Sequence, residues 1–376
     1  MTGRERMTIA LRNGIPDRVP KYELPWKETL LRWYEEGLPR DVHPNDYFDF
    51  DLDECFMVDQ SLKLPEKTLE DTDDWLIRIN QNGVVEKWLK EKETGLPWFQ
   101  STKTPHCLEY TLKTAKDWAA HKERIKAAPD RVAVVRWGDY LDGLDFDEPW
   151  PAKREKIRTA RARNKFNLLL LWEPYDLNWR WWGQEEFLIK MKTEPDLIRD
   201  IFEVTTRFVL ELTELLLGEK VEFDGVFFGG DIAYKNGMFF SPPMYRELLM
   251  PYHQRIFSFF RQRDIPILYD TDGNVDQALP LLIEAGIDAL RPLEAKCGND
   301  VRVLKGKYGD RVALVGNMNV VELQKGKEAI YREVVSKLQV AKRGGGYVFC
   351  SDHTLPPMSL ENYRYALELV AEYGKY

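Results

Sequence analysis

The feature that most constrains this chain is a regular alternation that begins at Phe166 and continues to the end of the sequence. Short apolar runs alternate there with longer segments in which apolar residues recur at helical spacing. The short runs predict buried parallel strands, and the longer segments predict the helices that connect such strands. We therefore predict an α/β fold, specifically a (β/α)8 TIM barrel. The predicted helices cover residues 194–217, 243–263, 275–285, 327–343 and 360–373.

Two zones precede this regular part. Up to about residue 86 the sequence predicts an N-terminal helical extension, with helices over 4–13 and 26–36 and a strand over 18–23. Residues 87–165 are dense in charged side chains, and their clearest strand signal is 132–135. We predict that residues 1–376 form a single domain in which 87–165 contributes partly to the barrel and partly to an inserted lid or rim, since barrels of about 250 residues tolerate insertions. This zone is rich in tryptophan: Trp88, Trp98, Trp118, Trp137 and Trp150.

Two glycines fall just past predicted helices, Gly286 and Gly374. Helices commonly end on a residue in the left-handed conformation, which glycine adopts without steric cost. We therefore predict left-handed backbone at both positions.

The charge balance and the cysteines restrict the class of partner and the compartment. A formal net charge of −8 disfavours nucleic acid and anionic membranes as partners, because both require a basic face. Cys55, Cys107, Cys297 and Cys350 lie far apart without a CxxC pair, which predicts reduced thiols. Residues 1–7 lack the apolar core of a signal peptide, and no stretch approaches the roughly 18 to 20 apolar residues of a membrane span. We expect a cytoplasmic protein.

Acidic residues follow the apolar runs with unusual regularity. Glu173, Asp231, Asp270 and Glu294 each come at or just after such a run, and the last run leads to His353. In a parallel barrel the carboxyl ends of all strands open on one face, and that face holds the chemistry of barrel enzymes. We therefore predict an active site for a small molecule built from these side chains.

The segment Asp270-Thr271-Asp272-Gly273 is the sharpest local signal. In an extended stretch Asp270 and Asp272 point the same way and Thr271 points opposite. Two carboxylates on one side can bind a divalent cation, share a proton, or act as an acid and base pair. A helix N-cap is the alternative interpretation, and it explains one aspartate more easily than two.

His353 lies just beyond the last predicted strand. Imidazole titrates near neutral pH and is the commonest metal ligand, so His353 is predicted as a metal ligand or a general acid and base, with Asp352 orienting it. A packed, hydrogen-bonded histidine is the alternative. Asp231 follows two glycines on a loop that can approach a ligand, or it is a turn residue. Glu294 is a further candidate, although it could simply pair with Arg291 or Lys296.

Aromatic residues cluster after the run that ends at Trp172. Clustered tryptophans usually belong to a core, but ligand pockets are also lined by aromatic side chains. We predict that part of this cluster forms a pocket wall for an aromatic or planar ligand. The predicted substrate-binding residues are Trp179, Trp182, Tyr269 and Asn317.

Taken in order, these segments resemble the uroporphyrinogen decarboxylase (URO-D) superfamily, which includes methyltransferases that work with corrinoid proteins. The resemblance is carried by residues 4–7, 16–20, 231–242, 270–273, 316–317, 353 and 372–374. It implies a (β/α)8 barrel with its site at the carboxyl ends of the strands.

The sequence departs from both well-known branches of that superfamily. True uroporphyrinogen decarboxylases carry an N-terminal Arg-rich motif that neutralises substrate carboxylates, whereas residues 21–27 read Lys-Tyr-Glu-Leu-Pro-Trp-Lys. The thiol-methylating branch has a zinc site built from His-x-Cys-Gly and a later Cys. Here residues 270–273 read Asp-Thr-Asp-Gly, and His353 stands where the later Cys would be. Hard oxygen and imidazole ligands thus replace soft thiolates.

The resemblance and these departures lead to one main expectation. The chain would be the demethylase component of a corrinoid-dependent methyltransferase system, moving a methyl group from a small substrate, such as a methoxylated aromatic, to cobalamin on a partner corrinoid protein. The catalytic candidates are His353, Asp270 and Asp231, and the candidate ligands of a zinc ion are Asp270, Asp272, Glu294 and His353. The chain is also compatible with a homodimer.

Two other functions stay open from the sequence. The first is a cofactor-free decarboxylase of the uroporphyrinogen decarboxylase type, in which Asp231 or Asp270 stabilises a cationic intermediate and His353 assists protonation. The second is a non-catalytic barrel that binds a tetrapyrrole or a corrinoid.

Overall fold

The computed structural model describes residues 1–90, 105–136 and 145–376. Within these ranges one sheet of eight strands organises the fold, in the order β14-β13-β12-β11-β8-β7-β1-β6. Neighbours from β14 to β1 pair in parallel, and β6 pairs antiparallel with β1. The strands are β1 (Leu52–Val58), β6 (Val132–Arg136), β7 (Phe166–Trp172), β8 (Gly225–Gly229), β11 (Ile267–Asp270), β12 (Ala289–Arg291), β13 (Ala313–Val315) and β14 (Tyr347–Val348).

These strands form where the sequence has its short apolar runs. Every residue of β8, β12, β13 and β14 is buried. Strands of a parallel sheet are covered on both faces, so they read as continuous apolar runs rather than as alternating ones. The predicted α/β fold with a parallel sheet is therefore confirmed.

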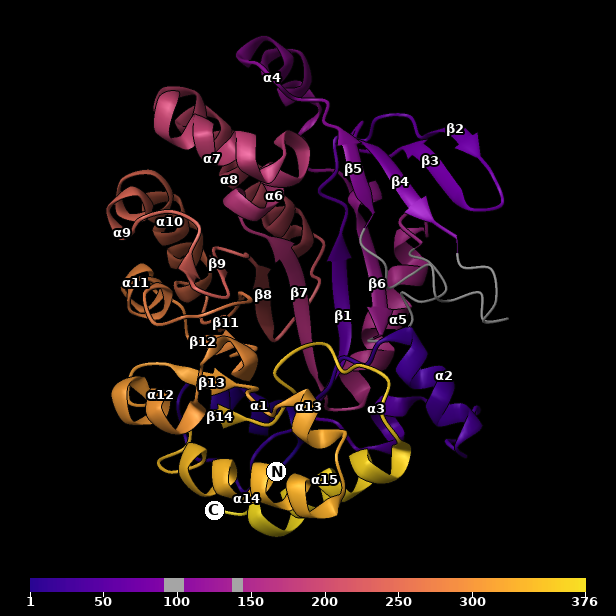
Figure 1. Cartoon of the computed structure of the whole chain (residues 1–376), viewed down its shortest axis with the longest axis vertical. Helices are drawn as coiled ribbons and strands as arrows, with labels where there is room; N and C mark the ends of the chain where they lie inside the picture. Colours follow the sequence, from indigo (N-terminus) through magenta and orange to yellow (C-terminus); the bar gives the residue numbers. More distant parts are fainter. Residues whose placement is uncertain (91–104, 137–144) are drawn as a thin grey trace.

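Helices cover the outside of the sheet, as Figure 1 shows. The predicted helices at 194–217, 275–285, 327–343 and 360–373 are confirmed within a few residues, whereas 243–263 is divided by a π-helical turn at Tyr245–Leu249. No helix among the described residues is both long and apolar enough to cross a membrane. The helices that follow Phe166 are α6 (Pro174–Trp182), α7 (Gln184–Thr193), α8 (Pro195–Gly218), α9 (Pro242–Met244), α10 (Met250–Arg261), α11 (Ala278–Ala285), α12 (Val301–Tyr308), α13 (Val320–Leu323), α14 (Lys327–Ala341) and α15 (Leu360–Tyr373).

A second, four-stranded antiparallel sheet lies at the upper end of the molecule in Figure 1. It starts at Lys67, ahead of the predicted insertion at 87–165, and its outer strand β2 is exposed along its whole length. Strand β6 and helix α5 of the same zone pack on the main sheet instead. Trp98 and Trp137 lie outside the described residues. The elements are β2 (Lys67–Asp71), β3 (Trp75–Ile79), β4 (Val85–Leu89), β5 (His106–Glu109), α4 (Ala115–His121) and α5 (Trp150–Ala162).

The N-terminal extension connects the two ends of the parallel ladder. The segment predicted as a strand at 18–23 is extended and forms a parallel bridge from Lys21 to Phe349, beyond β14. The Asp51 amide, just before β1, donates to the Lys21 carbonyl at 2.9 Å. Closure of the sheet into a complete eight-stranded barrel stays a prediction. The helices of the extension are α1 (Gly3–Leu11), α2 (Lys27–Glu35) and α3 (Pro44–Tyr47).

The two glycines predicted to be left-handed differ. Gly286 has φ +110° and ends α11, as predicted. The prediction for Gly374 is wrong, since its φ is −83°. The chain continues from Gly374 along the N-terminal segment, where the Gly374 carbonyl accepts the Val19 amide at 2.8 Å, and this path requires no left-handed residue.

Candidate functional site

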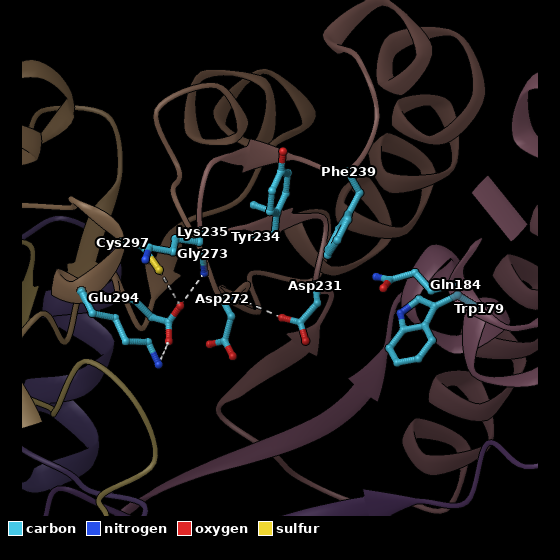
Figure 2. Close-up of a pocket in the computed structure, with 12 residues that line it drawn as sticks. Trp179, Gln184, Asp231, Tyr234, Lys235, Phe239, Asp272, Gly273, Glu294 and Cys297 are labelled. Atoms are coloured by element: carbon cyan, nitrogen blue, oxygen red, sulfur yellow. Dashed lines mark hydrogen bonds and ion pairs between the residues drawn. The ribbon is translucent and has the colours of Figure 1, made fainter. Parts of the chain in front are cut away.

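The predicted site residues come together at one edge of the parallel sheet. Asp270 is the last residue of β11, and Asp272 lies two residues further on. Asp231, Glu294 and His353 follow β8, β12 and β14, respectively. Figure 2 shows several of them around a pocket of about 520 Å³. The pocket is lined by Trp179, Gln184, Asp231, Ala233, Tyr234, Lys235, Phe239, Asp272, Gly273, Glu294, Lys296 and Cys297.

One group of side chains has the composition of a metal site. Asp272, Glu294 and His353 each present one ligand atom, and these three atoms lie within 4.8 Å of one another. Two carboxylate oxygens and an imidazole nitrogen are a donor set that zinc and other divalent cations accept. Three of the four predicted metal ligands therefore form one compact group.

Glu294 is held firmly in this group. Its Oε2 accepts the Gly273 amide at 2.7 Å and the Cys297 thiol at 3.2 Å, and its Oε1 pairs with the Lys296 ammonium at 2.7 Å. Burial, together with the neighbouring Glu294 carboxylate, raises the pKa of Cys297 to about 11, so its sulfur stays a thiol at neutral pH. Lys296 is the partner of Glu294, while Arg291 pairs elsewhere.

His353 faces Asp272, and Nε2 of the ring lies 3.6 Å from Oδ2 of the carboxylate. The contact with Asp272 raises the pKa of His353 against the opposing effect of burial. Burial alone would raise the pKa of Asp272, but His353, Arg291 and Lys296 together lower it. The expectation that Asp352 orients His353 is wrong, because the Asp352 carboxylate accepts the backbone amides of Ala295 and Val320.

A second acidic group shares Asp272. Asp231, Asp270 and Asp272 also present ligand atoms within 4.8 Å of one another, and Oδ1 of Asp231 accepts the Asp272 amide at 3.0 Å. Burial, reinforced by neighbouring carboxylates, raises the pKa of Asp231 to about 8. Burial also raises the pKa of Asp270 to about 7, although the Arg291 guanidinium lies 2.8 Å from its Oδ2. Two of the predicted catalytic groups can therefore carry a proton near neutral pH.

Aromatic rings form other parts of the pocket wall. Trp179 from α6 is fixed by its indole N–H, which donates to Oδ1 of Asp176 at 2.7 Å. Tyr234 and Phe239 stack with their centroids 5.2 Å apart: Tyr234 ends β9 (Ala233–Tyr234) and Phe239 directly follows β10 (Gly237–Met238) of a small hairpin. In Figure 2 Trp179 and these two rings stand on different sides of the acidic groups.

The other predicted substrate-binding residues lie outside the pocket lining. Trp182 is buried beside Phe187, and Tyr269 is buried against His253. Asn317 is buried as well, where its side chain accepts the Val301 amide and donates to the Asn299 carbonyl, both at 3.0 Å. It thereby joins the loop after β13 to the loop that carries Glu294.

The sequence-based prediction missed several lining residues. Tyr234 and Lys235 belong to the β9–β10 hairpin and Phe239 directly follows it; the strands of this hairpin have two residues each and give no measurable period. The pair Asn236-Gly237 is the signal that could have found this hairpin, because such pairs favour tight turns between strands. Gln184 and Cys297 carry no comparable signal.

Glu173, a further strand-end carboxylate, serves the fold. It is fully buried at the start of α6, where it accepts the amides of Tyr175 at 2.8 Å and Asp176 at 2.6 Å. Its Oε2 also lies 2.8 Å from Nε2 of buried His253, whose Nδ1 lies 2.9 Å from the Tyr245 hydroxyl.

The fold and this pocket define an α/β protein of the parallel-sheet class whose acidic, histidine-containing site lies at the carboxyl ends of its strands. The model of the family "Uroporphyrinogen decarboxylase (URO-D)" matches residues 181–373, which include every residue of the pocket lining except Trp179. The chain belongs to the uroporphyrinogen decarboxylase family.

Individual relatives are more distant. A uroporphyrinogen decarboxylase of Pseudomonas fluorescens is 35% identical over 122 residues, 31% of this chain and 33% of that protein. One of Coxiella burnetii is 30% identical over 183 residues, 46% of this chain and 48% of that protein. The chain thus covers about a third to a half of these relatives. The solved structure "methyltransferase from Methanosarcina mazei" is similar in fold, with a TM-score of 0.64, 16% identity and 99% of each chain covered.

Proposed function

We propose that this chain is a corrinoid-dependent methyltransferase, the demethylase component that moves a methyl group from a small methyl ether to the cobalamin of a partner corrinoid protein. The observation that carries the proposal is the compact group of Asp272, Glu294 and His353, of which Asp272 and Glu294 line a pocket with aromatic walls. The similarity of fold to the methyltransferase from Methanosarcina mazei supports it.

The residues present fit a divalent cation such as zinc. Asp272, Glu294 and His353 would hold it. Asp270 lies next to Asp272 and pairs with Arg291. A cation bound there supplies Lewis acidity to an ether oxygen of the substrate. The donor set lacks thiolate, so it fits an oxygen-bound methyl group better than activation of a thiol substrate.

The chain's own residues would then complete the reaction. The C–O bond of the ether breaks, the methyl group passes as a cation equivalent to the reduced corrinoid, and both bonding electrons stay on oxygen. That oxygen must take up one proton. Asp231 lines the pocket and accepts the Asp272 amide through its Oδ1, so its carboxyl group is placed to deliver this proton. The aromatic rings of Trp179, Tyr234 and Phe239 would hold the substrate.

Decarboxylation of a tetrapyrrole is the less favoured alternative. An octacarboxylate requires several cations, because each buried carboxylate must be paired. The described pocket lining holds Lys235 and Lys296 as its cations, and Lys296 is already paired with Glu294. A site for one small substrate agrees better with this lining.

The first test is metal content by elemental analysis of protein purified without chelators. We expect near-stoichiometric zinc or another divalent metal in the wild type, loss of most of it in His353→Ala and Glu294→Gln, and no change in His106→Ala, whose histidine is exposed on β5. The same proteins are then mixed with cob(I)alamin and a panel of methoxylated benzenes. Equal metal content in wild type and His353→Ala, or no methylation of cobalamin with any donor, would contradict the proposal.

A further inference from the structure

We propose that the substrate carries one anionic group, a carboxylate, on the aromatic ring that bears the reacting methyl ether, and that Lys235 binds this carboxylate. The inference rests on the proposed function and names the substrate class of the same pocket. It is carried by the position of Lys235, by the charges around the pocket and by the size of the pocket.

Lys235 belongs to a part of the pocket wall that is anchored next to the metal-ligand loop. It lies in the two-residue turn of the β9–β10 hairpin, between Tyr234 and Asn236. The Tyr234 carbonyl accepts the Asn274 amide at 2.9 Å. At Gly273 a side chain would meet the Tyr234 backbone at 2.6 Å, so the hairpin packs directly on the loop that carries Asp272. Lys235 is therefore held at the pocket by its backbone.

The two lysines of the pocket differ in their partners. Lys296 pairs with Glu294 at 2.7 Å. For Lys235, no carboxylate among residues 1–90, 105–136 and 145–376 forms an ion pair within 4.0 Å. Its side chain is exposed and lines the pocket, so its ammonium is available to a ligand.

The overall charge of the site favours one anion when a divalent cation is bound. The two charges of the cation offset Asp272 and Glu294, and Arg291 offsets Asp270. One of the two lysines offsets Asp231 even when that side chain is ionised, and the other lysine is left over. A carboxylate on the substrate would lower this excess positive charge whether Asp231 is ionised or protonated, whereas a cationic substrate would add to it.

The volume and the walls indicate how such a substrate fits. A cavity of about 150 Å³ holds benzene, so about 520 Å³ accommodates one substituted ring and its methoxy and carboxylate groups. The ring would lie against Trp179, Tyr234 and Phe239, with the ether oxygen toward Asp272 and the carboxylate toward Lys235.

Binding can be measured without turnover, by isothermal titration calorimetry on zinc-loaded protein. The probes share a ring and a methoxy group and differ in charge: 4-methoxybenzoate, neutral 4-methoxybenzyl alcohol and cationic 4-methoxybenzylamine. We expect the benzoate to bind at least about 10-fold more tightly than the alcohol, and the amine to bind most weakly. In Lys235→Met the preference for the benzoate over the alcohol should disappear, in Lys235→Arg it should persist, and in Lys307→Met, which changes an exposed lysine on α12, it should equal that of wild type.

The outcomes separate the two proposals. Equal or tighter binding of the alcohol or the amine by wild type overturns the anionic substrate class, and an unchanged preference in Lys235→Met overturns the role of Lys235. Methylation of cob(I)alamin is measured separately with the same three compounds. A charge preference without methylation refutes the methyltransferase function alone, while methylation without a charge preference refutes only the present inference.

Discussion

At the scale of single residues, the surroundings act differently on Asp272 and Asp231, the two aspartates that line the pocket. Asp272 faces His353 and has a lowered pKa, because nearby cations outweigh its burial. Asp231 faces other carboxylates instead, and its pKa is raised to about 8 by burial and by Asp176, Asp272 and Asp270. Adjacent acids with pKa values pushed apart can divide the roles of ligand and proton donor between them.

The raised pKa of Asp231 predicts a pH-dependent stability difference between wild type and Asp231→Asn, both stripped of metal. The folded protein keeps this proton up to about pH 8, whereas the ordinary pKa is 3.8. The contribution of protonated Asp231 to the free energy of unfolding is therefore complete below about pH 4 and is lost as the pH rises toward 8. The variant has no such loss, so we expect its advantage in urea unfolding to grow from pH 4 to pH 9 and to reach roughly 1–3 kcal/mol. Asp310→Asn, at an exposed site, should show no such trend, and a flat difference for Asp231→Asn would contradict the prediction.

At the scale of elements, the start of α6 depends on a buried polar chain rather than on the pocket. Glu173 caps this helix through two backbone amides and contacts His253 of α10, so a single carboxylate fixes two helices. The same helix carries Asp176 and Trp179, which shape the pocket wall. Glu173 was predicted as a strand-end carboxylate, and its position at the end of β7 agrees, but its oxygens are committed to the fold.

This arrangement predicts a strong and coupled stability effect. Removing one partner of a buried polar pair leaves the other without compensation, so Glu173→Ala should lower the free energy of unfolding by about 3–5 kcal/mol. Glu186→Ala on the exposed side of α7 should change it by less than about 0.5 kcal/mol. In a double-mutant cycle with His253→Phe, the double variant should lose less than the sum of the single losses. Additive losses in denaturant unfolding would show that the two side chains do not depend on each other.

At the scale of the whole molecule, the parallel sheet and its acidic edge were predictable, and much of the pocket wall was not. Apolar runs define buried parallel strands, and the two-residue period of a strand puts Asp270 and Asp272 on one side. The same period turns Tyr269 into the core. The exposed strand β2 has no apolar alternation, and the short β9–β10 hairpin has too few residues to show one. Contacts distant in sequence, such as Arg291 with Asp270, follow from the strand order, which the sequence does not display.

The N-terminal extension also acts on the whole molecule, because it joins α1, the extended segment and the start of β1 through Asp51. This carboxylate is 2% exposed, pairs with Arg6 at 2.5 Å and Arg18 at 2.8 Å, and accepts the Lys21 amide at 2.8 Å. Asp17 also pairs with Arg6, at 2.6 Å, but its side chain is 43% exposed. The two aspartates thus offer a matched comparison around one arginine.

Asp51→Asn should therefore lower the free energy of unfolding by up to about 3–5 kcal/mol, since it removes the one buried carboxylate that Arg6 and Arg18 share and leaves them only the more exposed Asp17 and Asp49. Asp17→Asn should cost less than about 1 kcal/mol, because solvent screens an exposed pair. Because Asp51 links the extension to the sheet, the loss should appear as one cooperative shift of the urea transition, measured by circular dichroism and tryptophan fluorescence together. Coincident curves at lower urea would fit this role, whereas an early separate transition would mean that the extension unfolds on its own and does not stabilise the sheet.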